Sequence, residues 1–181
     1  TDPDIINTIE KLINFQDVDV IIGGPPCQSF SSQGKARDKN SMSLDPRNYL
    51  YKSYIKVLNH FRPKFFVFEN VSGILSTKIN NQKIIDYIFS DMQQYYHIEE
   101  DPKTILLNAY DFGIPQDRKR VILIGVRKDL AFNVHNIYQE LKKIAQNQPK
   151  TTVSDAISDL PKLMPGEGHE TVEHYVNSEK N

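Results

Sequence analysis

The single cysteine of the sequence, Cys27, lies in a Gly/Pro segment directly after an apolar run. Residues 18–22 form that run, which is short, unbroken and rich in β-branched side chains, as is typical of a strand covered on both faces. Gly23 and the residues up to Pro26 end it. Open α/β sheets place their ligand sites beyond the carboxyl ends of their strands. A thiol at that place is either a small apolar filler or a nucleophile, because the thiolate is the reactive form of cysteine.

An acid and two bases occupy similar places further along the chain. Glu69 follows the apolar run 65–68, and its carboxylate either begins an exposed turn or faces the same crevice as Cys27. Arg118 and Arg120 lead into the apolar run 121–126, and strand alternation places them on one face. They form either an ordinary basic rim or a recogniser of a carbonyl or phosphate group.

The elements that would position these side chains alternate between strand and helix. Helical spacing of apolar residues predicts helices over 4–15, 49–61, 80–96 and 136–146, and a short one over 151–160 with Val153, Ala156, Ile157 and Leu160 inward. Strands are predicted over 18–22, 65–68, 104–108 and 121–126. This order predicts an α/β fold whose sheet is mostly parallel, with right-handed crossovers. The last two strands are predicted to form an antiparallel hairpin at the sheet edge.

Composition narrows the possible classes. A chain of 181 residues is one domain or part of one. One cysteine excludes an internal disulfide, and the five histidines have no metal-ligand spacing, so no metal site is predicted. We expect a soluble cytoplasmic protein, since no apolar stretch of about 18 residues or signal peptide is present. The net charge of −1 argues against a nucleic-acid binder that is basic over its whole surface.

The segment 29–47 is long and polar, and it has neither helical nor strand periodicity. Loops above about 12–15 residues inside compact domains are usually functional or disordered. The segment is therefore either a solvated linker or a lid that closes beside Cys27. Lys35, Arg37 and Lys39 make it locally basic.

Three segments at the predicted strand boundaries have a characteristic order and spacing. Residues 25–28 read Pro-Pro-Cys-Gln, 69–71 read Glu-Asn-Val, and 116–120 read Gln-Asp-Arg-Lys-Arg. Together they resemble the cytosine-C5 DNA methyltransferase family, and so do the flanks at 34–35, 45–47 and 107–116. The resemblance covers about residues 18–127, and 152–161 is similar to the segment that many members place before their target-recognition region.

The resemblance implies an incomplete Rossmann-like methyltransferase sheet and four catalytic residues. Cys27 would add to C6 of cytosine, which turns the poorly nucleophilic C5 into an enamine-like carbon. Protonated Glu69 would donate to N3 and orient the exocyclic amine. Arg120 would contact O2, with Arg118 in support, and both would act on charge that develops in the transition state.

The resemblance also implies double-stranded DNA as the partner and S-adenosylmethionine as the cofactor. A base inside a duplex cannot reach Cys27, so it would be flipped out. Ser31, Gln33 and Lys35 would contact the DNA from the long loop, whereas Pro26 and Leu50 match positions that line the cofactor. No membrane and no metal are expected.

Other parts of the family pattern have no counterpart here. The N-terminal Gly-rich cofactor loop, the target-recognition region and the closing C-terminal motifs are missing from the 181 residues. We therefore expect a partial catalytic domain over 1–149 and a boundary segment over 150–181, inactive in isolation. The family context suggests a restriction–modification system with a partner endonuclease. The alternatives are a transfer-RNA cytosine-C5 methyltransferase and a non-catalytic remnant or binding module.

Overall fold

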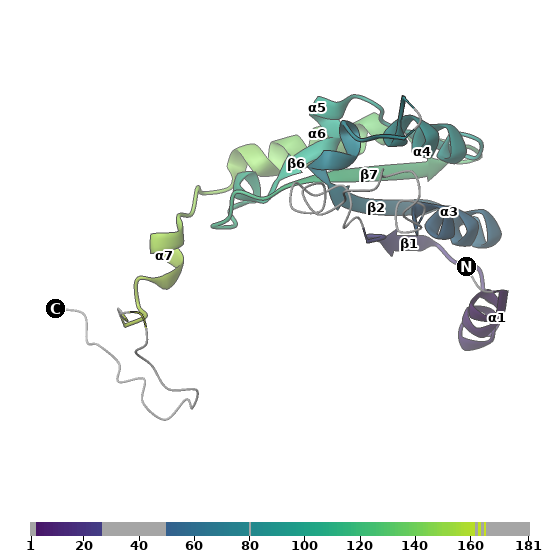
Figure 1. The fold of residues 1–181 in the computed structure, drawn as a ribbon, viewed down its shortest axis with the longest axis horizontal. Coiled ribbons are helices and arrows are strands. Elements are labelled where there is room, and N and C mark those ends of the chain that lie inside the picture. Colours follow the sequence, from purple (N-terminus) through teal and green to yellow (C-terminus); the bar gives the residue numbers. More distant parts are fainter. Residues whose placement is uncertain (1–2, 27–49, 80, 162, 164, 166–181) are drawn as a thin grey trace.

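The structure is a computed structural model that describes residues 3–26, 50–79, 81–161, 163 and 165 (Figure 1). Its helices are α1 (Pro3–Leu12), α3 (Leu50–Phe61), α4 (Ile84–Met92), α5 (Pro102–Ile105), α6 (Val134–Asn147) and α7 (Val153–Ile157). Its strands are β1 (Val20–Gly23), β2 (Phe65–Val71), β3 (Lys78–Ile79), β4 (Gln82–Lys83), β5 (Tyr96–Ile98), β6 (Leu106–Asn108) and β7 (Lys119–Arg127), with 3-10 turns η4 (Ser72–Leu75) and η5 (Ala109–Phe112). The predicted helices are confirmed with shifted ends. No helix in the described ranges is long and apolar enough to cross a membrane.

The main sheet has the strand order β1-β2-β7-β5, and β6 also pairs with β7. β1 and β2 are parallel, as the helical crossover through α3 predicts. The pairs β2–β7, β5–β7 and β6–β7 are all antiparallel. The prediction of a mostly parallel sheet is therefore wrong for the described strands. The strand after α4, which is β5, does not pair with β2, because β7 runs back between the two.

The predicted hairpin is confirmed as antiparallel, but its place is wrong. β6 pairs with the first residues of β7, whereas β7 itself lies inside the sheet with β2 on its other side (Figure 1). The strand predicted over 104–108 is also shorter than expected. Asp101 accepts a hydrogen bond from the Lys103 amide at 3.1 Å, and Pro102 begins α5, so a helical turn replaces the first half of that strand.

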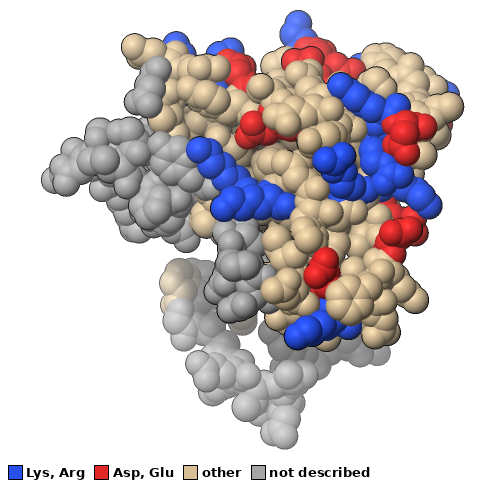
Figure 2. All heavy atoms as spheres, turned by 90° about the vertical axis from the view of Figure 1, so that its right-hand side faces the viewer, with Lys and Arg blue, Asp and Glu red and all other residues tan. Residues whose placement is uncertain are grey.

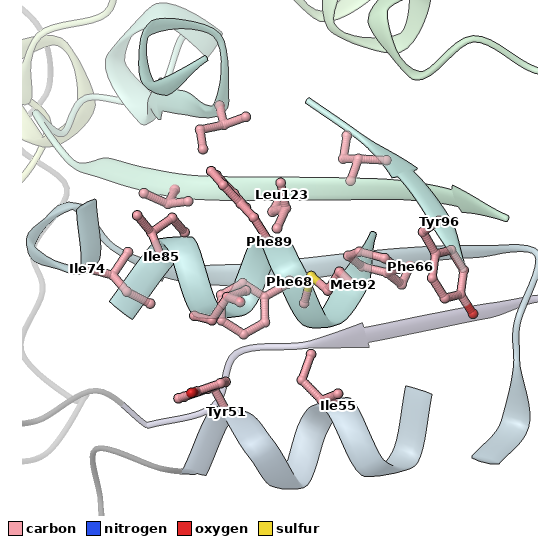
Figure 3. Close-up of a cluster of buried hydrophobic side chains, with 14 of the residues drawn as sticks. Tyr51, Ile55, Phe66, Phe68, Ile74, Ile85, Phe89, Met92, Tyr96 and Leu123 are labelled. Atoms are coloured by element: carbon pink, nitrogen blue, oxygen red, sulfur yellow. The ribbon is translucent and has the colours of Figure 1, made fainter. Parts of the chain in front are cut away.

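The core forms between the sheet and the helices α3 and α4 (Figure 3). Phe66 and Phe68 alternate with half-buried residues along β2 and are both fully buried. Tyr54 of α3 contacts both rings edge to face, at centroid distances of 6.3 and 5.4 Å. From α4, Phe89 and Met92 pack into the same cluster. These contacts hold α3 and α4 against the strands whose ends carry the candidate site.

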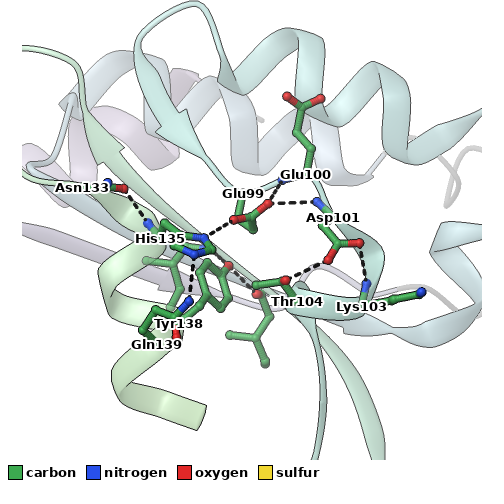
Figure 4. A network of polar contacts seen from close by, with 11 residues as sticks. Glu99, Glu100, Asp101, Lys103, Thr104, Asn133, His135, Tyr138 and Gln139 are labelled. Atoms are coloured by element: carbon green, nitrogen blue, oxygen red, sulfur yellow. Dashed lines mark hydrogen bonds and ion pairs between the residues drawn. The ribbon is translucent and has the colours of Figure 1, made fainter. Parts of the chain in front are cut away.

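A tyrosine fills the gap that β5 and β6 leave along β7. β5 pairs with residues 125–127 of β7 and β6 with 119–121, so the backbone between them has no strand partner on that side. The Tyr138 hydroxyl accepts from the Ile124 amide and donates to the Ile122 carbonyl, both at 2.9 Å. Beside it, Glu99 meets Nδ1 of His135 at 3.0 Å and links the segment after β5 to α6 (Figure 4).

Two expectations about burial are wrong. β1 is not covered on both faces within the described structure, since Val20 is 48% exposed and Ile22 is 75% exposed. The apolar residues of α7 do not point inward, because Val153 and Ile157 are 58% and 50% exposed. An apolar run indicates that a surface tends to be covered, but it does not indicate which part of the molecule covers it.

Candidate active site

The ends of β1 and β2 place the predicted acid beside the segment that leads to Cys27. The strands run parallel with Gly23 opposite Phe68, so the residues after them, Gly24 and Glu69, are neighbours. The strand predicted over 65–68 extends to Val71 as β2, so Glu69 lies within the strand and does not begin a turn, which was one of its two expected placements. A methyl group built at Gly24 would lie 2.8 Å from Oε2 of Glu69. The Glu69 carboxylate therefore rests against a bare stretch of backbone.

The start of β7 brings a guanidinium to the same edge. Because β7 is antiparallel to β2, its first residues lie opposite the last residues of β2, with Arg120 opposite Val71. Nε of Arg120 meets Oε1 of Glu69 at 3.0 Å. The side chains are 23% and 42% exposed, and such partly exposed pairs contribute about 0–1 kcal/mol to stability. The pair therefore matters less for stability than for ligand binding, because both side chains remain accessible to a ligand.

Asn70 ties the two strand ends together. It is 2% exposed, and its Nδ2 donates to the Pro25 carbonyl at 3.3 Å. Its Oδ1 accepts from the Val71 amide at 2.8 Å. A buried carboxamide that makes both contacts fixes the segment before Cys27 relative to Glu69. Asn70 was not among the predicted site residues, although strand alternation places it on the buried face with Phe68, which is an unusual place for a polar side chain.

Arg118 and Arg120 do not share a strand. β7 begins at Lys119, so alternation along the strand does not place Arg118. Its side chain is exposed and forms no ion pair with any residue in the described part of the chain. Its backbone amide donates to Oδ1 of Asn108 at 3.0 Å. The structure thus joins Glu69 to Arg120, but not to Arg118.

The remaining predicted residues divide into two groups. Pro26 is exposed and is the last described residue after β1, and Leu50 is half-buried as the first residue of α3. Those outside the described residues are Cys27, Ser31, Gln33 and Lys35. The roles predicted for all six residues stay predictions.

The opposite end of the molecule has a different character. Figure 2 views the end where β1 and β2 start, and there Lys and Arg side chains lie beside Asp and Glu. Lys64 meets Asp19 at 2.7 Å, and Arg127 meets Asp129 at 2.7 Å. The hydrogen bond from Arg127 holds the pKa of Asp129 below its usual value. Charges of both signs offset one another here, so this end is not a uniformly basic surface.

Comparison with known proteins shows to which family the chain belongs. A model of the C-5 cytosine-specific DNA methylases matches residues 2–181. The chain belongs to the C-5 cytosine-specific DNA methylase family. Members of this methylase family use S-adenosylmethionine. The resemblance seen in the three motifs is therefore confirmed.

Two similar methylases are bacterial type II methyltransferases. M.Bpa9945I of Bacillus paralicheniformis is 43% identical over 174 residues, which are 92% of this chain and 38% of the relative. M.DdeI of Desulfomicrobium norvegicum is 40% identical over 164 residues, which are 91% and 37%. A crystal structure assigned as a DNA modification methyltransferase of an E. coli prophage matches with a TM-score of 0.65 and 30% identity, over 87% of this chain and 40% of that one. The methylase chain thus spans about two fifths of the length of these relatives.

Proposed function

We propose that the chain is the catalytic middle of a DNA cytosine-C5 methyltransferase that works through a covalent bond between Cys27 and C6 of a flipped cytosine. The observation that carries this proposal is the Glu69–Arg120 pair at 3.0 Å, at the edge where the segment leading to Cys27 leaves β1. An acid and a guanidinium that act together with a cysteine nucleophile suit covalent catalysis on a pyrimidine. Membership in the methylase family supports the same reaction.

The reaction balances with these groups. The Cys27 thiolate forms a bond to C6, and the electron pair of the C5–C6 double bond moves toward N3 and O2. C5 would then take the methyl group from the sulfonium of S-adenosylmethionine, which leaves as the neutral thioether with the electron pair of the broken C–S bond. A base outside these four residues, such as a water molecule, would take the C5 proton, and elimination would release the thiolate and restore the C5–C6 double bond. Of the four candidate residues, Cys27 forms the bond to C6, and the other three stabilise the charge that develops on the ring.

Glu69 and Arg120 divide the polar edge of the base between them. Arg120 uses Nε for Glu69 and Nη1 for the Lys119 carbonyl at 2.9 Å, which leaves Nη2 to donate to O2. Glu69, protonated, donates to N3, and its second oxygen accepts from the exocyclic amine. Arg118 supports O2 or the thiolate from the exposed turn before β7. These contacts strengthen as charge moves onto the ring, so they act mainly on turnover.

The substrate is double-stranded DNA, and the target base leaves the stack to reach Cys27. Ser31, Gln33 and Lys35 close over the DNA from the loop that follows. For the cofactor, the chain supplies apolar surface through Pro26 and Leu50. Both side chains are hydrocarbon, so they would pack against the cofactor without a hydrogen bond of their own to it. We therefore infer that this chain forms one wall of the cofactor site and neither binds S-adenosylmethionine tightly nor methylates DNA alone.

The boundary at residue 150 is part of the proposal. The segment after it presents exposed apolar side chains, namely Val153, Ile157, Leu160 and Leu163 at 50–58% exposure. Such a surface suits a segment that packs against further protein, as expected for one that leads into a target-recognition region. A role in restriction–modification, with a partner endonuclease, follows the type II relatives.

Covalent trapping tests the proposal. The complete gene product, with S-adenosylmethionine and duplex DNA containing 5-fluorocytosine, should form an adduct that denaturation does not remove, since the fluorine blocks the final elimination. Cys27→Ser should abolish the adduct and Glu69→Gln should slow it, whereas the matched surface change Glu140→Gln should leave it unchanged. An adduct that survives Cys27→Ser would reject the mechanism, and no adduct would favour a non-catalytic remnant. Labelling of transfer RNA in place of DNA would favour the RNA enzyme.

A further inference from the structure

We propose that Asn108 is a positioning residue that clamps the start of β7 and so keeps Arg120 at Glu69. The proposal rests on the function proposed above, because it assigns a purpose to the geometry of Arg120. Asn108 is the last residue of β6, and its backbone pairs with Lys119, next to Arg120. It touches neither Glu69 nor the guanidinium of Arg120 through any described contact, so it would act through the backbone.

The Asn108 carboxamide holds both sides of the connection between β6 and β7. Oδ1 accepts from the Arg118 amide at 3.0 Å and from the Tyr110 amide at 3.3 Å. Nδ2 donates to Oδ1 of Asp117 at 2.8 Å. The two amide donors and the carboxylate acceptor fix which end of the side chain is nitrogen and which is oxygen. One side chain therefore caps η5 and holds the turn that precedes β7.

The clamp lies where the backbone ladder ends. The pairing of β6 with β7 ends at Asn108 and Lys119. Between the two residues that lie next in the connection, the backbone bond runs from the Ala109 amide to the Arg118 carbonyl at 3.0 Å. Strand ends open at a low free-energy cost unless something beyond them holds them closed. Arg120 is only the second residue of β7, so its backbone lies in the part that would open first. The Asn108 contacts to Asp117 and Arg118 come just before that part and hold it in register.

Asn108 also lines a pocket of about 440 Å³ between α5, β6, η5 and α6, so its side chain is open to solvent on one side. Water can replace its hydrogen bonds when the side chain is removed. Removal should therefore leave the core intact while it frees the start of β7. A positioning role therefore changes turnover and local opening together, and it leaves hydrogen exchange in the core unchanged.

The experiment uses the complete gene product and reads turnover together with local opening. Asn108→Ala should lower kcat for DNA methylation about tenfold with little change in KM for DNA, because a loosened start of β7 misplaces Arg120. Amide hydrogen exchange in peptides that span residues 117–121 should become faster. Asn133→Ala is the matched control: Asn133 caps α6 through the His135 amide at 2.9 Å, so its loss removes a similar cap elsewhere. It should change neither kcat nor exchange at 117–121.

A swap of the two partners provides a rescue. Asn108→Asp alone keeps the acceptor for Arg118 but sets a second carboxylate against Asp117, so it should be as slow as Asn108→Ala. Adding Asp117→Asn restores a donor and an acceptor with exchanged roles, and kcat should return to within about threefold of the wild type. Wild-type exchange at 117–121 in Asn108→Ala, or no rescue in the double variant, would overturn the clamp. An inactive wild type with fast exchange in Asn108→Ala would instead reject the proposed function and keep the clamp.

Discussion

Gly23, the last residue of β1, and Gly24, which follows it, should respond differently to the same added methyl group. At Gly24 the new Cβ would lie 2.8 Å from Oε2 of Glu69, which is the far end of a flexible side chain. At Gly23 it would lie 2.7 Å from Cε2 of Tyr54, within a ring that is packed on Phe66 and Phe68. The first neighbour can move aside, and the second cannot do so without disturbing the core.

The magnitudes follow from these distances. Ordinary van der Waals contact begins at 3.4 Å, so in Gly24→Ala the Glu69 carboxylate must retreat by about 0.6 Å. If Glu69 has the role proposed above, kcat should fall about tenfold, because a displacement of 1 Å in a catalytic group can cost about 100-fold. Stability should stay equal or rise by about 0.4–1 kcal/mol, because alanine restricts the unfolded chain. Gly23→Ala should instead lower the free energy of unfolding by about 1–3 kcal/mol through overpacking.

Steady-state methylation and urea unfolding of the complete gene product separate the two effects. Gly24→Ala should be a slow enzyme with undiminished stability, and Gly23→Ala an unstable protein. The Tyr54 hydroxyl resists movement in the second variant, because it donates to the Val67 carbonyl at 3.1 Å. A Gly24→Ala enzyme with wild-type kcat would refute the reasoning, since it would show that the exact place of the Glu69 carboxylate does not matter.

Two further predictions concern stability away from the site. Tyr138→Phe keeps the ring but leaves the Ile122 carbonyl and the Ile124 amide of β7 without their hydroxyl partner, so unfolding by urea should require about 1–3 kcal/mol less; an unchanged midpoint would contradict this. For Glu99, the hydrogen bond from His135 lowers the carboxyl pKa below its ordinary 4.5, so its contribution is complete above that pH and is lost as the pH falls through the lowered value. The melting temperature of Glu99→Gln should therefore fall less steeply below pH 4.5 than that of the wild type, and parallel curves would argue against it.

Local patterns in the sequence predict the helices and the parallel pair β1–β2 well. The helix over 49–61 is α3 with the same C-terminal residue, because its spacing, together with Pro63, determines where it ends. The helix predicted over 80–96 is shorter, since β4 takes its first residues and β5 its last one. These elements depend on neighbours within a few residues, which a pattern along the chain can record.

Pairing over long distances is not recorded in such patterns. β7 is an apolar run that suits an edge or a central strand equally, and its central place depends on which partners cover it. Tyr138 illustrates this point, since its hydroxyl serves a gap that exists only because β5 and β6 stop short of each other along β7. Likewise, β1 and α7 carry apolar side chains that remain exposed, because the described part of the chain does not cover them.

The antiparallel direction of β7, which was predicted wrongly for the interior of the sheet, is what brings Arg120 to Glu69. If β7 ran parallel to β2, its first residue would lie beside the start of β2. Arg120 and Glu69 would then lie at opposite ends of the strand pair. Because β7 is antiparallel and adjacent to β2, the register sets Arg120 opposite Val71, two residues from Glu69. An acid at the end of one strand and a base at the start of the next thus meet beside the segment that leads to Cys27. The Glu-Asn-Val and Arg-Lys-Arg segments thus meet beside Pro25 because of the antiparallel pairing that the strand–helix alternation did not predict.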